Sequence, residues 1–342
     1  MRLGLIARAD SRGLGVQTKA FHDQMQPTKT LVVDCPSIQP LPLRRDWYPD
    51  AEWVKIPTTD DFNKFLDGID TVFTCETGYN AALWDMAEVR GIKTVLQANF
   101  EFLDRLDRPT LWLAPSLWRI NEWPEGTVHL PVPVETEHFP ARDLPDLPTR
   151  LLHIVGRPTL DRGRDMHRNG TIDFLNALQH VTTKCTVTIR CQHDTYANDL
   201  IRTHGIRMPT NVDLQVIPND LPNYWDAYQT EHALIMPRRF GGLCLPANEA
   251  VAAGIPVIMP DIDPNDTWLP PEWLVPASQV GAERAKQVID TYAVDPIQLA
   301  VKLQQLLTDP GFYGEAKKTA QKLRWRLSWD SLKRYYLEVL ER

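Results

Sequence analysis

The feature that most constrains the fold is an alternation of short apolar runs with helical segments, which occurs twice along the chain. In the first half, strand-length apolar runs lie at 1–7, 30–34, 71–75, 94–97 and 111–114. Helical patterns separate them at 16–25, 58–66 and 81–90. Strands that alternate with helices at this spacing predict an α/β fold with a parallel, doubly wound sheet.

The same alternation starts again after a proline-rich segment at 131–148. Strands are expected at 151–155, 185–190, 212–217, 233–236 and 255–259, and helices at 171–180, 196–203, 221–230 and 246–253. Prolines at this density interrupt regular structure and stiffen a connector. We therefore expect two Rossmann-like domains, at 1–145 and 146–315, and a C-terminal helix at 316–342 that packs back on the first domain.

Composition limits the classes of function. The 342 residues carry a formal net charge of -7, which argues against a protein that coats nucleic acid non-specifically. The five cysteines are scattered without a Cys-x-x-Cys pair, so the pattern predicts reduced thiols rather than disulfides or a zinc site. With neither a signal-peptide pattern at Met1–Arg8 nor a long apolar run, we expect a cytoplasmic protein.

The strongest motif is the segment 237–258, Pro-Arg-Arg-Phe-Gly-Gly-Leu-Cys-Leu-Pro-Ala-Asn-Glu-Ala-Val-Ala-Ala-Gly-Ile-Pro-Val-Ile. A glycine pair lets the backbone approach a ligand closely, and Pro246 suits the first position of a helix. A helix N-terminus at the carboxyl edge of a parallel sheet favours an anion. Glu249 can accept hydrogen bonds from ligand hydroxyls there, or it can serve only as an acidic residue near a helix start.

A second strand–loop–helix corner lies at 153–178. Its loop contains four arginines, whose guanidinium groups suit a diphosphate. They are Arg157, Arg162, Arg164 and Arg168. The alternative is a solvated loop with ion pairs to Asp161 and Asp165.

Together these motifs resemble GT-B-fold retaining glycosyltransferases of the family-4 type, the superfamily of glycogen synthase and many mannosyltransferases. Gly156-Arg157 resembles the family's Gly-Arg strand end, and Arg168-Asn-Gly170 resembles its Lys-Gly, with Arg162-Gly163 as a second candidate. Gly241–Val257 resembles the family's Glu-x7-Glu motif, with Gly241 in place of the first glutamate. The resemblance extends over essentially the whole chain.

The resemblance implies roles for these residues. Arg157 and Arg168 would stabilise the phosphate that leaves, with Arg162 close by, and Glu249 would hold the donor's ribose. Position 241 touches the transferred sugar in the family, so Gly241 would lack the side-chain contact with the sugar that the family's glutamate makes. The backbone N–H groups of Gly242 and Leu243 would still serve the phosphate and sugar.

The first domain would hold the acceptor. Gly13 and Gly15 resemble the glycine-rich loop that faces the donor phosphates, although a tight turn would also need glycine. Asn99 stands where many relatives carry an active-site histidine, and would orient a hydroxyl because an amide cannot act as a base. Asp10, Arg12, Glu76 and Glu101 are further candidates on the acceptor side. Both glutamates can equally be surface residues.

The resemblance predicts a retaining transfer of a hexose, glucose above all, from a UDP-linked donor to a hydroxyl. No metal or other cofactor is expected, since Asp261-Ile-Asp263 lies after the donor helix in a proline-rich turn. The Arg-Asn-Gly loop and Gly-Gly-Leu-Cys-Leu-Pro look like phage-type members, for which the acceptor would be 5-hydroxymethylpyrimidine in DNA. The alternatives are a protein, saccharide or lipid acceptor, or a nucleotide-sugar-binding module without catalysis. No pattern predicts membrane insertion or an oligomeric state.

Overall fold

The computed structural model describes residues 1–34, 42–156, 158, 160, 161, 164, 165, 168–193, 195–218 and 221–341. The chain divides into two compact units. Unit 1 comprises Met1–Pro133, Ala285–Gln287 and Trp329–Arg342, and unit 2 comprises Val134–Arg284 and Val288–Ser328. The chain thus enters unit 2 at Val134 rather than at 146, and returns to unit 1 at Trp329 rather than at 316.

The position of the first division follows from a contact between residues that are distant in sequence. The backbone N–H of Val134 donates to the carbonyl of Leu327 at 2.7 Å, and both side chains lie in the core of unit 2. Most of the proline-rich segment is therefore part of unit 2.

Unit 1 contains a seven-stranded sheet in which all neighbouring strands are parallel. Its strands are β1 (Leu3–Ala7), β2 (Lys29–Val33), β3 (Glu52–Val54), β4 (Thr71–Cys75), β5 (Lys93–Gln97), β6 (Leu111–Ala114) and β7 (Val128–His129). The order is β3-β2-β1-β4-β5-β6-β7. Every residue of β1 and β4 is buried, as expected for parallel strands covered on both faces.

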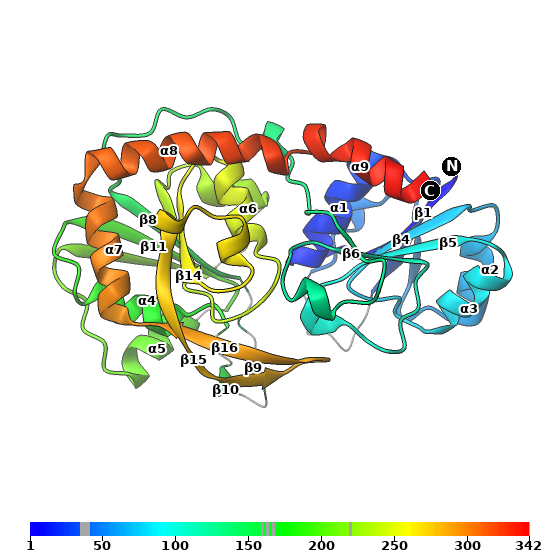
Figure 1. The fold of residues 1–342 in the computed structure, drawn as a ribbon, viewed down its shortest axis with the longest axis horizontal. Helices are drawn as coiled ribbons and strands as arrows, with labels where there is room; N and C mark the ends of the chain where they lie inside the picture. The colour runs from blue at the N-terminus through cyan, green and yellow to red at the C-terminus, as the bar shows by residue number, and fades with distance from the viewer. Residues whose placement is uncertain are drawn as a thin grey trace. The chain divides into compact units, whose positions relative to one another are not determined.

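The helices of unit 1 include one from the far end of the chain. They are α1 (Gly13–Met25), α2 (Thr59–Leu66), α3 (Ala82–Val89) and α9 (Trp329–Glu341). A capping box between Thr58 and Asp61 starts α2. Helix α9 packs against α1 and β4, so the red end of the chain lies beside the blue end (Figure 1).

Unit 2 contains a second seven-stranded sheet, in the order β12-β11-β8-β13-β14-β15-β16. Its strands are β8 (Arg150–Gly156), β11 (Cys185–Cys191), β12 (Val212–Ile217), β13 (Ala233–Ile235), β14 (Val257–Asp261), β15 (Leu274–Arg284) and β16 (Val288–Val294). All neighbours are parallel except β15 and β16, which form an antiparallel hairpin that the sequence analysis did not predict. A separate short ladder pairs β9 (Leu160–Asp161) with β10 (Arg164–Asp165).

The helices of unit 2 are α4 (Thr171–Leu178), α5 (Tyr196–Thr203), α6 (Leu245–Ala252), α7 (Pro296–Thr308) and α8 (Pro310–Arg324). The helix predicted at 221–230 is wrong: only a 3-10 turn, η5 (Tyr224–Tyr228), forms there. Pro222 lacks an N–H, and Asn223 donates its side-chain amide to Asp226 instead of supporting a helix.

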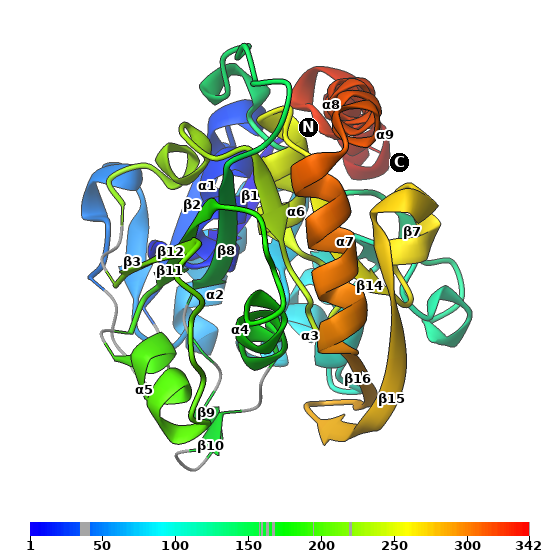
Figure 2. The same cartoon turned by 90° about the vertical axis from the view of Figure 1, so that its left-hand side faces the viewer.

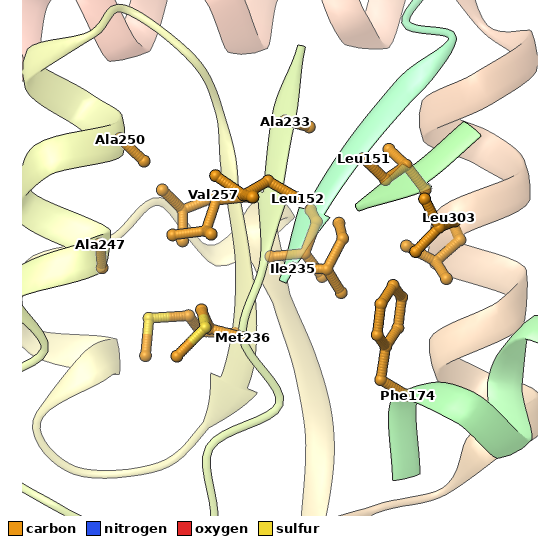
Figure 3. Packing of buried hydrophobic residues seen from close by; sticks show 14 of the residues in the cluster. Leu151, Leu152, Phe174, Ala233, Ile235, Met236, Ala247, Ala250, Val257 and Leu303 are labelled. Atoms are coloured by element: carbon orange, nitrogen blue, oxygen red, sulfur yellow. The ribbon is translucent and has the colours of Figure 1, made fainter. Parts of the chain in front are cut away.

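The core of unit 2 lies on both faces of its sheet. In Figure 3, Ala247 and Ala250 of α6 lie on one side of the strands, and Phe174 and Leu303 lie on the other. Figure 2 shows α4 beside α7, from which these last two side chains come. Ile235 and Val257 of the central strands are fully buried between the layers.

In both sheets the strand order reverses at one place, between β1 and β4 in unit 1 and between β8 and β13 in unit 2. Ligands of doubly wound folds bind beyond the carboxyl ends of the strands at such a reversal. The loops that follow these four strands therefore contain the positions where a site is expected. Across the described residues, no helix is both long enough and apolar enough to cross a membrane.

Candidate functional site

At the reversal point of unit 2, the two loops that the sequence analysis selected lie in contact. One loop leads from β8 to α4, and the other leads from β13 to α6. The N–H of Arg239 donates to the carbonyl of Arg168 at 2.8 Å. Gly170 has a φ of +65° and lies so close to Pro237 that a Cβ at Gly170 would be 1.9 Å from the Pro237 carbonyl oxygen. Only glycine fits there, so the sequence Asn169-Gly170 fixes the contact between the loops.

A buried histidine links the strands and the helix next to these two loops. His153 of β8 lies 2.8 Å from the carbonyl oxygen of Ile235 through Nδ1 and 3.0 Å from Oγ1 of Thr171 through Nε2. Because a carbonyl only accepts, Nδ1 carries the proton and Nε2 accepts from the threonine hydroxyl. Burial lowers the pKa of His153 to about 4, so the ring is neutral and acts as a structural link.

Gly241 brings two arginines together. It has a φ of +118°, and a Cβ placed there would lie 2.5 Å from Nη2 of Arg238 and 2.9 Å from Nη2 of Arg168. The guanidinium of Arg168 also lies 5.2 Å from the ring centre of Phe240. The space in which a side chain at 241 would begin is thus filled by positive charge.

The neighbouring Arg239 has a different role. Its Nε and Nη2 donate to the two carboxylate oxygens of Asp173, at 2.8 and 2.7 Å. Asp173 lies in the first turn of α4, where a negative charge is favourable. This bidentate ion pair joins the β13–α6 loop to α4, whereas Arg238 and Arg168 lie at the 241 position.

Glu249 is held inside α6 with one oxygen occupied. It is 8% exposed, and its Oε2 accepts a hydrogen bond from the Tyr228 hydroxyl at 2.5 Å. Burial raises the pKa of Glu249 to about 7, and the hydrogen bond from Tyr228 offsets part of that rise. Oε1 has no hydrogen-bond partner among the described residues, so it remains able to accept from a ligand.

The start of α6 lies next to these groups. Pro246 occupies the first turn, and no described side chain caps the helix at Cys244. Nη1 of Arg238 donates to the carbonyl of Leu243 at 2.5 Å, which fixes the backbone of the Gly242–Leu243 segment. Arg157 and Arg162, the other two arginines selected for the phosphates, lie outside the described residues.

In unit 1, the loop after β1 is built around a buried ion pair. Nη2 of Arg8 lies 2.9 Å from Oδ2 of Asp10, and the backbone N–H of Arg12 donates to Oδ1 of Asp10. A Cβ at Gly15 would be 1.9 Å from the carbonyl oxygen of Asp10, so glycine is required where α1 packs on this loop. Gly13 is exposed at the first residue of α1. Both acceptor-side candidates in this loop, Asp10 and Arg12, thus lie at the carboxyl edge of the sheet.

A second cluster of unit 1 joins the loops after β4 and β5. Glu76 and Tyr79 both have positive φ angles, of 62° and 61°, which is uncommon outside glycine. Nδ2 of Asn99 donates to Oε1 of Glu76 at 3.2 Å, while Oδ1 of Asn99 is buried with no described partner. Glu101 is 1% exposed, so the surface alternative considered for it is wrong.

The residues that sequence reasoning missed are Arg238, Tyr228 and the linking role of His153. Arg238 lies inside the selected motif, and the pair of arginines before Gly241-Gly242 was the available signal. No local pattern connects Tyr228 with Glu249. Among the described residues, the group whose ligand atoms lie close enough for a metal is Glu135, Glu137 and His138, within 4.8 Å of one another. His138 stacks on Trp225, and Asp261 and Asp263 are not part of that group.

Comparison with known proteins was made on this geometry. No family model matches the chain, and no curated protein matches it. The chain is similar to the solved structure of sucrose-phosphate synthase from Thermosynechococcus elongatus, at a TM-score of 0.69 and 14% identity, over 98% of this chain and 97% of that one. It is also similar to HepE from Anabaena in complex with UDP and glucose, at a TM-score of 0.69 and 10% identity, over 100% of both chains.

A third similar structure is the lipopolysaccharide outer core galactosyltransferase WaaB, at a TM-score of 0.61 and 13% identity, over 98% of both chains. At identities this low, the structural similarity shows the fold alone. The chain therefore has the two-domain α/β architecture of these glycosyltransferases, the GT-B fold.

Proposed function

We propose that the chain is a retaining glycosyltransferase that moves a hexose from a UDP-linked donor to a hydroxyl acceptor. The observation that carries the proposal is Glu249, buried in the middle of α6 with Oε2 hydrogen-bonded to Tyr228 and Oε1 available. It lies in the loop–helix segment whose preceding turn brings the guanidinium groups of Arg168 and Arg238 together. A carboxylate that accepts hydrogen bonds from hydroxyl groups suits the ribose of a nucleotide sugar, and the guanidinium of Arg168 suits its diphosphate.

The donor's parts are assigned to separate groups. Oε1 of Glu249 accepts hydrogen bonds from the ribose hydroxyls. The diphosphate binds Arg168 and the N-terminus of α6, together with Arg157 and Arg162 in the preceding loop. The backbone of Gly242 and Leu243 lies against the transferred sugar and its phosphate.

The chemistry needs no cofactor in this proposal. The bond between the sugar's anomeric carbon and the β-phosphate oxygen breaks while the acceptor oxygen attacks on the same face. The departing phosphate takes the acceptor's proton. Arg168 and Arg157 stabilise the negative charge that develops on the leaving group, an electrostatic effect that is usually the largest single contribution to catalysis. Fixed cations and a helix dipole take the place of a divalent ion.

For the acceptor we propose 5-hydroxymethylpyrimidine in DNA, oriented by Asn99 with Asp10, Arg12, Glu76 and Glu101 nearby in unit 1. The acidic balance of the chain makes a protein or saccharide hydroxyl the main competing acceptor. Transfer of labelled sugar onto hydroxymethylated duplex DNA supports the proposal. Transfer onto a protein or saccharide, with none onto that duplex, overturns the DNA assignment and leaves the glycosyltransferase intact.

The first experiment is a donor screen by thermal shift and by donor hydrolysis, using UDP-, GDP- and TDP-sugars with and without EDTA. A shift with UDP-sugars that EDTA does not change supports a metal-independent, UDP-dependent enzyme. Loss of the shift in EDTA contradicts the metal-free chemistry. Binding without hydrolysis or transfer supports the competing function, a nucleotide-sugar-binding module, which the glycine at 241 favours. No binding of any nucleotide sugar contradicts both functions.

A further inference from the structure

Arg238 is a buried cation without a counter-ion among the described residues. It is 8% exposed, on the loop between β13 and α6. Nη1 donates to the carbonyl of Leu243, whereas Nε is shielded from solvent and has no partner in the described part of the chain. No described carboxylate oxygen lies within ion-pair distance of Arg238, although Arg239, the next residue, is fully paired with Asp173.

Such an arrangement is unfavourable for the protein alone. A guanidinium stays charged at any physiological pH, so burial cannot be relieved by loss of a proton. An unpaired buried charge is strongly destabilising unless a partner neutralises it. Two other arginines of unit 2 have carboxylate partners, Arg239 with Asp173 and Arg150 with Glu231. An anion from a ligand would complete the environment of Arg238.

The position of Arg238 indicates which part of a donor supplies that anion. Its Nη2 lies 2.5 Å from the point where a Cβ at Gly241 would be, and Nη2 of Arg168 lies 2.9 Å from the same point. The resemblance described in the sequence analysis places position 241 at the transferred sugar, because the motif that this segment resembles has a glutamate there. In this chain two guanidinium groups lie at position 241, so the charge that faces the sugar is positive where a glutamate would make it negative.

We propose that the transferred sugar is acidic, a hexuronate or a similar sugar whose carboxylate binds Arg238, and that Arg238 determines this specificity. The inference rests on the proposed function and replaces the neutral hexose by its carboxylate-bearing derivative. The planar fork of a guanidinium matches a carboxylate with two parallel hydrogen bonds. A neutral hexose would leave the charge of Arg238 buried and unpaired.

The experiment compares UDP, UDP-glucose and UDP-glucuronate by calorimetric titration of the full chain. The two sugars differ only at C6, as a hydroxymethyl group or a carboxylate. We expect UDP-glucuronate to bind about 10-fold more tightly than UDP-glucose, the effect of one charge-assisted contact. Arg238→Gln should reduce this ratio to about one while the affinity for UDP stays the same. Arg238→Lys should keep part of the preference, because it keeps the charge but not the fork.

The control is Arg202→Gln, which removes an exposed arginine of α5 that pairs with Asp199 and should leave the ratio unchanged. If Arg238→Gln weakens the binding of UDP as much as the binding of UDP-glucuronate, Arg238 binds the diphosphate and the inference is overturned. Equal or tighter binding of UDP-glucose by the unmodified chain overturns it as well. If Arg238→Gln does not fold, the inference is tested by the ratio of UDP-glucuronate affinity to UDP-glucose affinity in the unmodified chain and in Arg238→Lys. A lower ratio in Arg238→Lys supports the inference, and the same ratio in both proteins overturns it. Absence of binding by UDP and both sugars contradicts the proposed function itself.

Discussion

At the scale of single residues, the backbone conformation at position 241 and the lack of space for a Cβ atom there both require glycine. Its φ of +118° lies in the region that side chains with a Cβ rarely adopt, and the buried end of Arg238 fills the place of that Cβ. Any other residue must displace Arg238 from the loop. A glutamate, which the motif that this segment resembles has at the first position, therefore does not fit at position 241 without such a displacement.

Gly241→Ala is expected to lower the free energy of unfolding by about 1–3 kcal/mol through backbone strain and to weaken binding of nucleotide sugars through displacement of Arg238. The matched control is Gly254→Ala, since Gly254 also has a positive φ, of 74°, but the nearest atom to its Cβ position is Cγ of Gln321, at an ordinary contact distance of 4.0 Å. Chemical unfolding and donor titration of both variants provide the measurement. Equal donor affinity in the two variants would show that the Gly241–Arg238 packing does not serve the ligand.

Glu249 makes stability depend on pH. Burial raises its pKa to about 7 in the folded chain, from 4.5. The folded state therefore holds the proton more tightly than the unfolded state. The resulting stability is fully present below pH 4.5 and is lost as pH rises through 7, by up to roughly 3 kcal/mol.

We predict that Glu249→Gln removes this decline. The variant should become more stable than the unmodified chain at pH 8, and the difference between them should shrink toward pH 5, as measured by unfolding in urea without ligand. The donor should bind at least about 10-fold more weakly, because an amide is a poorer acceptor for ribose hydroxyls than a carboxylate. Parallel stability curves for the two proteins from pH 5 to 8 would refute the buried-carboxylate interpretation.

At the scale of elements, the sequence predicted the buried parallel strands of the two sheets better than it predicted the exposed hairpin or the contacts between elements. Buried parallel strands such as β1 and β4 are continuous apolar runs, which are easily recognised. The hairpin of β15 and β16 was missed because most of β15 is exposed and carries no buried run. The candidate loops were located by glycine and arginine patterns, whereas the hydrogen bond from Tyr228 to Glu249 joins elements that no local pattern connects.

Helix α9 completes the core of unit 1 through Tyr336. The Tyr336 hydroxyl accepts from Nε2 of Gln97 at 2.9 Å and lies 3.1 Å from the carbonyl of Pro131, which can only accept. Tyr336 is 1% exposed, and its ring packs near Phe21 and Phe73. The hydroxyl therefore joins α9 to β5 inside the molecule.

Tyr336→Phe is expected to destabilise unit 1 by about 1–3 kcal/mol, because Gln97 and the Pro131 carbonyl lose a buried partner. Hydrogen exchange should become faster in α9 and β5 while unit 2 is unchanged. Tyr313→Phe is the control in unit 2, where the hydroxyl donates to the carbonyl of His232 at 3.0 Å. Faster exchange in α9 and β5 in both variants would show that Tyr336 has no special role there.

At the scale of the whole molecule, unit 1 is assembled from both ends of the chain, and unit 2 is the segment between them. The proline-rich segment suggested a boundary at 145, but composition cannot show which core a connector joins. Val134 and Phe139 belong to the core of unit 2, while Leu130 belongs to that of unit 1. The division thus follows contacts between distant residues, such as Val134 with Leu327, rather than any local signal.

Among the described residues, each unit has buried hydrophobic residues clustered on its own, which predicts separate unfolding of the two units, and a ligand should distinguish the two events. Glu249, Arg168 and Arg238 all lie in unit 2, so UDP at 100 times its dissociation constant should stabilise unit 2 by about 2.7 kcal/mol and unit 1 by less. Hydrogen exchange with and without UDP measures this: the amides of α4, α6 and β13 should gain protection, and those of β1 and β4 should change little. Equal gains in both units would mean that the two cores unfold as one cooperative structure.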